Sequence, residues 1–67
     1  MQDSTLTALE IESLRWSMDA KTPVDIAHIM NLPESEVRSS LASAMRKLAC
    51  PTKYQAVLKA IQLGLLA

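Results

Sequence analysis

The chain has 67 residues, 49% of them apolar, with one Gly, three Pro, one Cys and one His, and this composition excludes a disordered tail and an internal disulfide. Seven acids balance seven bases overall, but residues 1–36 hold all seven acids and two bases, whereas residues 37–67 hold five bases and no acid. These charges of −5 and +5 favour a basic working surface at one end of a single small domain, although a solvated lysine-rich helix would look the same.

The first helix is predicted to begin after Thr7. This residue suits the N-cap position, and Glu10, three residues later, has the spacing of a capping box. Leu14 and Met18 lie four residues apart and so share one face, which predicts the side that is buried. The helix should end near residues 19 and 20.

The second helix is predicted to begin after Thr22. Pro23 is favourable at the first helical position, and Asp25 complements the positive end of the helix dipole. The helix is short, about two turns. Its expected buried side consists of Ile26, Ala27, Ile29 and Met30.

A break follows at "NLP", residues 31–33, because Asn tolerates turn geometry and Pro33 restricts Leu32 to extended conformations. The third helix is predicted over residues 34–48, which gives a helix, a short turn and another helix. At about 100° per residue its two sides separate clearly. The apolar side holds Val37, Leu41, Ala44, Met45 and Leu48. The opposite side holds Ser35, Arg38, Ser39, Ala42, Ser43 and Arg46.

The fourth helix is predicted to begin after Thr52, which forms a second capping box with Gln55, and to run towards Leu63, with Gly64 as its stop. Its apolar arc spans roughly 220°, about twice what a core-facing stripe needs. One stripe is therefore expected to face inward, namely Ala56, Val57, Ala60 and Leu63. The other is expected to form a dimer interface, namely Tyr54, Leu58, Ile61 and Leu65.

Catalytic and metal-binding patterns are absent from the sequence. His28 is the only histidine, the carboxylates are scattered over helix starts, and no Gly-rich phosphate loop occurs. We therefore expect no enzyme activity, no metal and no cofactor. No apolar run approaches the roughly 20 residues that span a bilayer, and the first residues lack a signal peptide's basic region. We expect no membrane partner and a cytoplasmic location.

The helix, turn, helix unit is suggestive of DNA binding, and the order of short motifs makes the interpretation more specific. The marks are "LT" with Glu10 and Glu12, "LRW" at 14–16, "KT" at 21–22, "DIA" at 25–27, "VR" at 37–38, "RKL" at 46–48 and "QAVLKAIQLGLL" at 55–66. Together they resemble the LuxR/GerE-type helix-turn-helix domain of quorum-sensing regulators over residues 6–66. The sequence is thus expected to be one all-α, four-helix domain of this type, residues 1–67.

The resemblance implies that the third helix enters the major groove of double-stranded DNA and that the fourth makes the contact of a homodimer. Transferred position by position, it implies base-edge contacts for Arg38, Ser39 and Ala42. It implies phosphate or sugar contacts for Lys21, Thr22, Ser43, Arg46 and Lys47. Ser35 lies on the same face and joins this set. Arg38 is the best candidate for base readout, because its planar fork can pair bidentately with guanine.

An alternative function stays open, because the sequence departs from the family's pattern on this face. Glu36 stands where the family commonly has Thr, and Ala42 where a basic residue is frequent. Such changes should weaken DNA affinity, which depends on neutralising phosphates. The alternative is a small antagonist that pairs with a full-length LuxR-type regulator through the fourth helix. Ala20 also replaces the family's usual Gly, at a cost of up to about 1 kcal/mol if the site needs positive φ.

Overall fold

The structure is a computed structural model that describes residues 5–66, and over these residues it consists of four helices and no strand. The helices are α1 (Ala8–Met18), α2 (Pro23–Met30), α3 (Glu34–Lys47) and α4 (Lys53–Gln62). The all-α, four-helix prediction is confirmed. The predicted domain also included residues 1–4 and 67, which lie outside the described residues.

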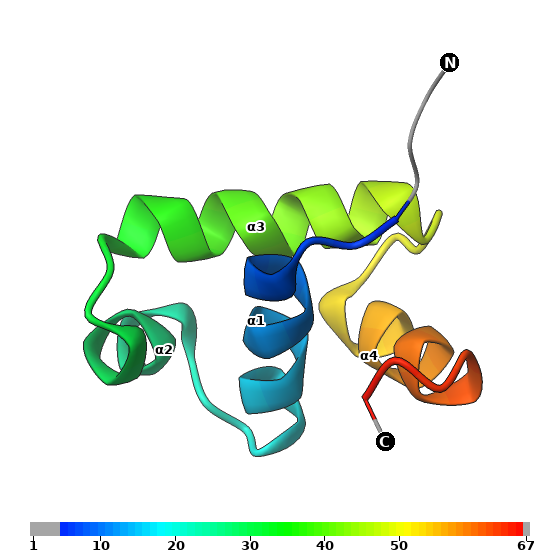
Figure 1. The fold of residues 1–67 in the computed structure, drawn as a ribbon, viewed down its shortest axis with the longest axis horizontal. Helices are drawn as coiled ribbons and strands as arrows, with labels where there is room; N and C mark the ends of the chain where they lie inside the picture. The colour runs from blue at the N-terminus through cyan, green and yellow to red at the C-terminus, as the bar shows by residue number, and fades with distance from the viewer. Residues whose placement is uncertain (1–4, 67) are drawn as a thin grey trace.

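Helix α3 lies across the other three helices (Figure 1). In this view α1 stands beneath the middle of α3 at a steep angle, with α2 on one side of it and α4 on the other. Contacts join α1 to each of the other helices, and α3 to each of the other helices. Helices α1 and α3 are therefore the two helices that contact every other helix of the domain.

Threonine hydroxyls cap three of the four helices, as the sequence predicts. Thr7, Thr22 and Thr52 each accept a hydrogen bond from the backbone N–H three residues later. The reciprocal bond that completes a capping box is present at α1 and α2. It is missing at α4, where Gln55 gives only its backbone N–H, so that part of the prediction is wrong.

All four helices end in the same way, with one residue in the left-handed region. The residues and their φ angles are Ala20 (61°), Asn31 (56°), Ala49 (57°) and Gly64 (77°). In each case the next residue donates its N–H to a carbonyl five residues back, at 2.9–3.2 Å. This is the Schellman motif, which satisfies carbonyls that the helix leaves unpaired. Gly adopts such a φ freely, whereas the Cβ of Ala is strained there.

Ala20→Gly and Ala49→Gly should therefore each stabilise the domain by about 0.5–1 kcal/mol. Both alanines are exposed, so the loss of a methyl group removes no core packing. The measurement is the free energy of unfolding in urea. Ala42→Gly is the matched control, because Ala42 is exposed in the interior of α3 and the same change there should destabilise by about 1 kcal/mol. Equal effects at all three positions would contradict the assignment of strain.

The core lies where α1, α2, α3 and α4 meet, and its fully buried large side chains are Leu14, Ile26 and Val37. Two residues expected in the core are instead substantially exposed, namely Met18 and Ile29. Helix α2 contacts the domain only along the side that carries Ile26 and Ala27, and Ile29 lies outside that arc. Met18 is the last residue of α1, where the chain leaves the core.

The end of α4 differs from the prediction at two leucines. Ala56 and Ala60 are buried and Val57 packs on the core, as expected, but Leu63 is exposed. Leu65, predicted as part of the outer stripe, instead packs against the core beside the buried Leu66. The cause is the turn at Gly64, which ends the helical periodicity and brings the chain back. The wheel that assigned Leu63 and Leu65 to opposite faces assumed one more turn of helix.

Candidate nucleic-acid interface

The unit formed by α2, a short turn and α3 presents one face of α3 to solvent. Asn31 adopts a left-handed conformation, and the N–H of Leu32 bonds to the carbonyl of Ala27 at 2.9 Å, which ends α2. Pro33 then precedes α3 in an extended conformation (φ −62°, ψ 143°). Val37, Leu41, Ala44 and Leu48 are buried and hold α3 on the domain. At 1.5 Å per residue its 14 residues extend roughly 21 Å.

The residues proposed from the sequence for DNA contact lie mainly on this free face. Five of its six polar-side residues are exposed, namely Ser35, Arg38, Ser39, Ala42 and Arg46, and Ser43 is half-buried. Lys21 and Thr22 are exposed as well, but they lie at the start of α2. The structure thus brings most of the set together on α3 and leaves those two on a separate element.

An ion pair occupies the beginning of the exposed α3 face. Nε of Arg38 donates to Oε2 of Glu34, one helical turn earlier, at 2.5 Å. The side chain of Arg38 is 61% exposed and that of Glu34 is 42% exposed. Glu36 is also exposed at this end, so the first turn of α3 carries two carboxylates. Sequence reasoning did not pair Glu34 with Arg38, although their spacing of four residues is the signal for such a pair.

The start of α2 carries a carboxylate too. Asp25 accepts a hydrogen bond from the backbone N–H of Thr22 at 3.1 Å. This bond and a second bond with the Thr22 side chain lower the pKa of Asp25. The hydroxyl of Thr22 in turn accepts the N–H of Asp25 at 3.2 Å. The backbone donor at this helix start is therefore already used within the domain. Lys21 lies beside it and supplies positive charge.

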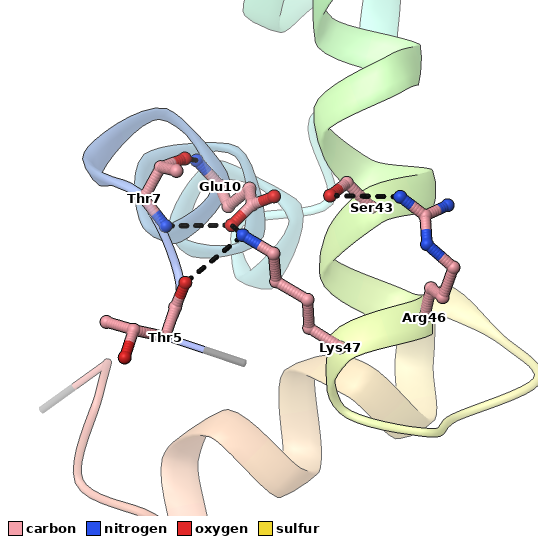
Figure 2. Close-up of polar contacts among 6 residues, drawn as sticks. All are labelled: Thr5, Thr7, Glu10, Ser43, Arg46 and Lys47. Atoms are coloured by element: carbon pink, nitrogen blue, oxygen red, sulfur yellow. Dashed lines mark hydrogen bonds and ion pairs between the residues drawn. The ribbon is translucent and has the colours of Figure 1, made fainter. Parts of the chain in front are cut away.

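The other end of the α3 face carries Arg46, which is exposed and directed away from α1 (Figure 2). Its Nη2 lies 3.5 Å from Oγ of Ser43, a long and weak contact. The guanidinium is therefore available to an external anion. Arg46 and Lys47 place positive charge in the last turn of α3, which is the favourable sign at a helix carboxyl terminus.

Lys47 differs from the rest of the proposed set, because its ammonium group is engaged inside the domain. Its Nζ lies 2.9 Å from Oε1 of Glu10 and 3.1 Å from the carbonyl oxygen of Thr5 (Figure 2). Its side chain is 20% exposed and that of Glu10 is 5% exposed. The same Oε1 accepts the backbone N–H of Thr7 at 2.7 Å. The capping carboxylate of α1 thus also holds the end of α3.

The environment of Glu10 stabilises its charged form. Burial by itself raises the pKa of this carboxyl. Hydrogen bonds from Ser43, from the Thr7 backbone and from Lys47, together with the charge of Lys47, outweigh burial and lower the pKa to about 2. The carboxylate therefore stays ionised at neutral pH. Ser43, assigned to the DNA-facing set by sequence, is turned at least partly towards this group.

A second exposed surface lies on α4 and is apolar. Tyr54 is 76% exposed, Leu58 57% and Ile61 43%, and we call these three residues the α4 outer face. The sequence predicted them as a stripe, and their exposure is confirmed. Nζ of Lys53 lies 5.7 Å from the centre of the Tyr54 ring. A groove of about 400 Å³ runs from this face to the turn between α1 and α2.

Comparison with known proteins gives the family. The model of the bacterial regulatory proteins of the luxR family matches residues 4–60. This chain belongs to that family. The LuxR-type domain is a helix-turn-helix domain of transcription regulators. The resemblance inferred from the sequence motifs is therefore confirmed. The family consists of bacterial regulatory proteins.

The relatives of this LuxR-type domain have names that refer to transcription. The chain is 41% identical over 61 residues to the transcriptional activator protein AnoR of Acinetobacter nosocomialis, covering 91% of this chain and 26% of that protein. It is 38% identical over 58 residues to the transcriptional activator protein VanR of Vibrio anguillarum, covering 87% and 24%. It is 36% identical over 63 residues to the quorum sensing-dependent transcriptional regulator VjbR of Brucella ovis, covering 94% and 24%. The chain spans about a quarter of the length of these relatives.

None of the helices within residues 5–66 combines the length and the apolar character needed to cross a bilayer. Over the same residues, His, Cys, Asp and Glu form no group of three or more that could hold a metal ion. Cys50 is a half-buried free thiol, whose Sγ lies 3.4 Å from the carbonyl oxygen of Leu48.

Proposed function

We propose that this LuxR-type domain binds double-stranded DNA as a homodimer, with α3 in the major groove, and that it regulates transcription in the bacterial cytoplasm. Family membership supports DNA binding. The observation that carries the choice of helix is the face of α3 opposite the core, which is exposed and polar and holds Arg38 and Arg46. A helix of this kind fits the major groove, which is about 12 Å wide.

Base readout is assigned to the first half of α3. The guanidinium of Arg38 can donate two parallel hydrogen bonds to O6 and N7 of guanine. Ser39 and Ser35 are short donors on the same face, and the methyl group of Ala42 suits the methyl group of thymine. Short side chains let the helix lie close to the base edges.

Phosphate contacts are assigned to residues around that reading surface. Arg46 and Lys21 supply exposed positive charge. The hydroxyls of Thr22 and Ser43 already bond to Asp25 and Glu10 within the domain, so we assign these two residues smaller shares. Lys47 was included in this set from the sequence. Since its ammonium already binds Glu10 and Thr5, we assign it a smaller share of phosphate binding than Arg46. Binding should weaken steeply as salt rises.

Dimerisation is assigned to the α4 outer face. Tyr54, Leu58 and Ile61 form an exposed apolar stripe, and Leu63 extends it in place of Leu65. A self-complementary stripe favours a two-fold dimer. Two copies of α3 would then read half-sites about one turn of DNA apart on a pseudo-palindromic site.

A second candidate function is an antagonist that pairs with a full-length LuxR-type regulator through the α4 outer face and blocks its DNA binding. The observation that favours it is the charge of the reading helix. Glu34 and Glu36 begin α3, and Lys47 at its end is held by Glu10. Each of these features lowers the attraction to phosphates. This function needs the α4 outer face but not Arg38.

Selection of duplexes from a random pool, followed by gel-shift measurements, distinguishes the two functions. The DNA-binding function predicts an enriched pseudo-palindromic sequence with the domain alone. The antagonist predicts no enrichment alone, and loss of a full-length regulator's shift when the domain is added. A domain that does neither would refute both proposals.

Arg38→Ala should remove most of the preference for the enriched sequence while leaving the fold intact. The loss of a bidentate base contact costs about 1–3 kcal/mol, or roughly 5- to 150-fold in affinity for that sequence. Arg38 is exposed, so circular dichroism and the urea midpoint should stay close to those of the parent. Arg46→Ala is the control, because loss of a phosphate contact weakens all duplexes about equally. Equal loss of preference in both variants would contradict the role of Arg38.

A further inference from the structure

The ion pair between Glu34 and Arg38 is too exposed to matter much for folding. With side chains 61% and 42% exposed, its attraction is screened by water, and pairs of this kind contribute little stability. The pair does, however, restrict one of the most flexible side chains on the α3 face. Any functional effect of the pair therefore depends on where it places the guanidinium of Arg38.

The atoms used in the pair leave the reading end of Arg38 free. Oε2 of Glu34 accepts from Nε, on the inner side of the guanidinium. Within residues 5–66 the two terminal nitrogens of Arg38 make no hydrogen bond. Those nitrogens supply the parallel donors that a guanine accepts. The Glu34 carboxylate thus restrains the guanidinium of Arg38 through Nε and leaves the two terminal nitrogens able to donate to a base.

We propose that Glu34 is a specificity-determining residue that acts by positioning Arg38 for a guanine. The inference rests on the proposed role of α3 in base readout. When Arg38 is paired, less conformational freedom is lost on binding its base. The carboxylate also repels phosphates, which weakens binding to every sequence alike. Glu34 therefore lowers total affinity and raises the ratio of specific to non-specific affinity.

Glu36 provides a matched control for charge. It lies two residues after Glu34 in the first turn of α3 and is exposed. Its side chain makes no ion pair or hydrogen bond with the part of the chain that the structure describes. Glu36→Gln thus removes the same charge at the same end of the helix without releasing Arg38.

The test measures affinity for the selected duplex and for a scrambled duplex of equal length, at one salt concentration. Glu34→Gln and Glu36→Gln should both tighten binding to the scrambled duplex. Only Glu34→Gln should lower the ratio of the two affinities, by about 2- to 10-fold, the effect of ordering one long side chain. Glu34→Asp keeps the charge but shortens the reach, so it should lower the ratio without tightening non-specific binding.

A double-mutant comparison separates positioning from direct readout by Glu34. In the Arg38→Ala background, Glu34→Gln should leave the ratio unchanged, because no guanidinium remains to be positioned. A ratio that falls in that background too would mean that Glu34 reads a base itself, and would overturn the inference. A parent ratio retained in Glu34→Gln would also overturn it. A parent that prefers no sequence would overturn the proposed function as well, so the two failures are distinguishable.

Discussion

Lys47→Met is expected to lower the free energy of unfolding by about 3 kcal/mol at neutral pH, because it leaves the Glu10 carboxylate buried without its cation. Domains of this size hold only about 3–5 kcal/mol in total. The variant should therefore be partly unfolded at room temperature, which urea denaturation followed by circular dichroism measures. Arg46→Met, one residue earlier and exposed, is the control and should change stability by less than about 0.5 kcal/mol.

The same cluster predicts how stability depends on pH. The pKa of Glu10 is lowered from 4.5 to about 2, so the folded state binds its proton less readily than the unfolded state. The stabilisation is therefore fully present above about pH 5 and is lost as pH falls towards 2. The shift corresponds to at most about 3 kcal/mol. Glu10→Gln should be much less stable than the parent at pH 6, and the difference should nearly vanish near pH 2.

A control for this pH dependence lies on the same helix. Glu12 pairs with Arg15, but its side chain is 41% exposed, so Glu12→Gln should alter stability by less than about 0.5 kcal/mol at either pH. If Glu10→Gln and Glu12→Gln behave alike, the ion pair between Glu10 and Lys47 does not hold the domain together. Rescue at low pH that appears only in Glu10→Gln supports the assignment.

Leu58→Asp should separate the proposed dimer without unfolding the domain. Leu58 is 57% exposed at the centre of the α4 outer face, so the monomer buries little of it. In a two-fold dimer the substitution places two carboxylates against an apolar partner, which should cost at least about 2 kcal/mol, or roughly 30-fold in the dimer constant. Sedimentation equilibrium measures this loss. Binding to a duplex with two half-sites should weaken far more than binding to one half-site.

Gln55→Asp is the matched variant for that experiment. It introduces the same charge into α4 at an exposed polar position, and the dimer should survive it. If the parent is monomeric at high micromolar concentration, or if Leu58→Asp unfolds, the α4 outer face is not an interface of this kind. The antagonist function makes the same demand on this face, with a LuxR-type regulator as partner, so the experiment tests the surface under either function.

Local signals in the sequence predicted most of the fold. The threonine caps, the break at Pro33 and the stop at Gly64 each depend on residues close together in the chain, and all are present in the structure. The exposed and buried sides of α3 followed from periodicity alone. The errors at Leu63 and Leu65 have a common cause. Periodicity assigns faces only while a helix continues, and α4 ends at Gln62.

The candidate site was less predictable, because it depends on partners that sequence spacing does not reveal. Lys47 and Glu10 are 37 residues apart, and nothing local distinguishes Lys47 from the exposed Arg46 beside it. From the sequence alone, both residues are expected to supply positive charge for DNA binding. In the structure Arg46 is available to a phosphate, whereas Lys47 is bound to Glu10 and Thr5. Glu34 and Arg38 are the opposite case, since their spacing of four is visible in the sequence.

The bond from Lys47 to the carbonyl oxygen of Thr5 has a structural consequence. It joins residues 42 apart in the chain, so the first described residue is fastened directly to the end of α3. Thr5 precedes the N-cap of α1 and Glu10 lies in its first turn, so Lys47 fixes the end of α3 to both sides of that helix start.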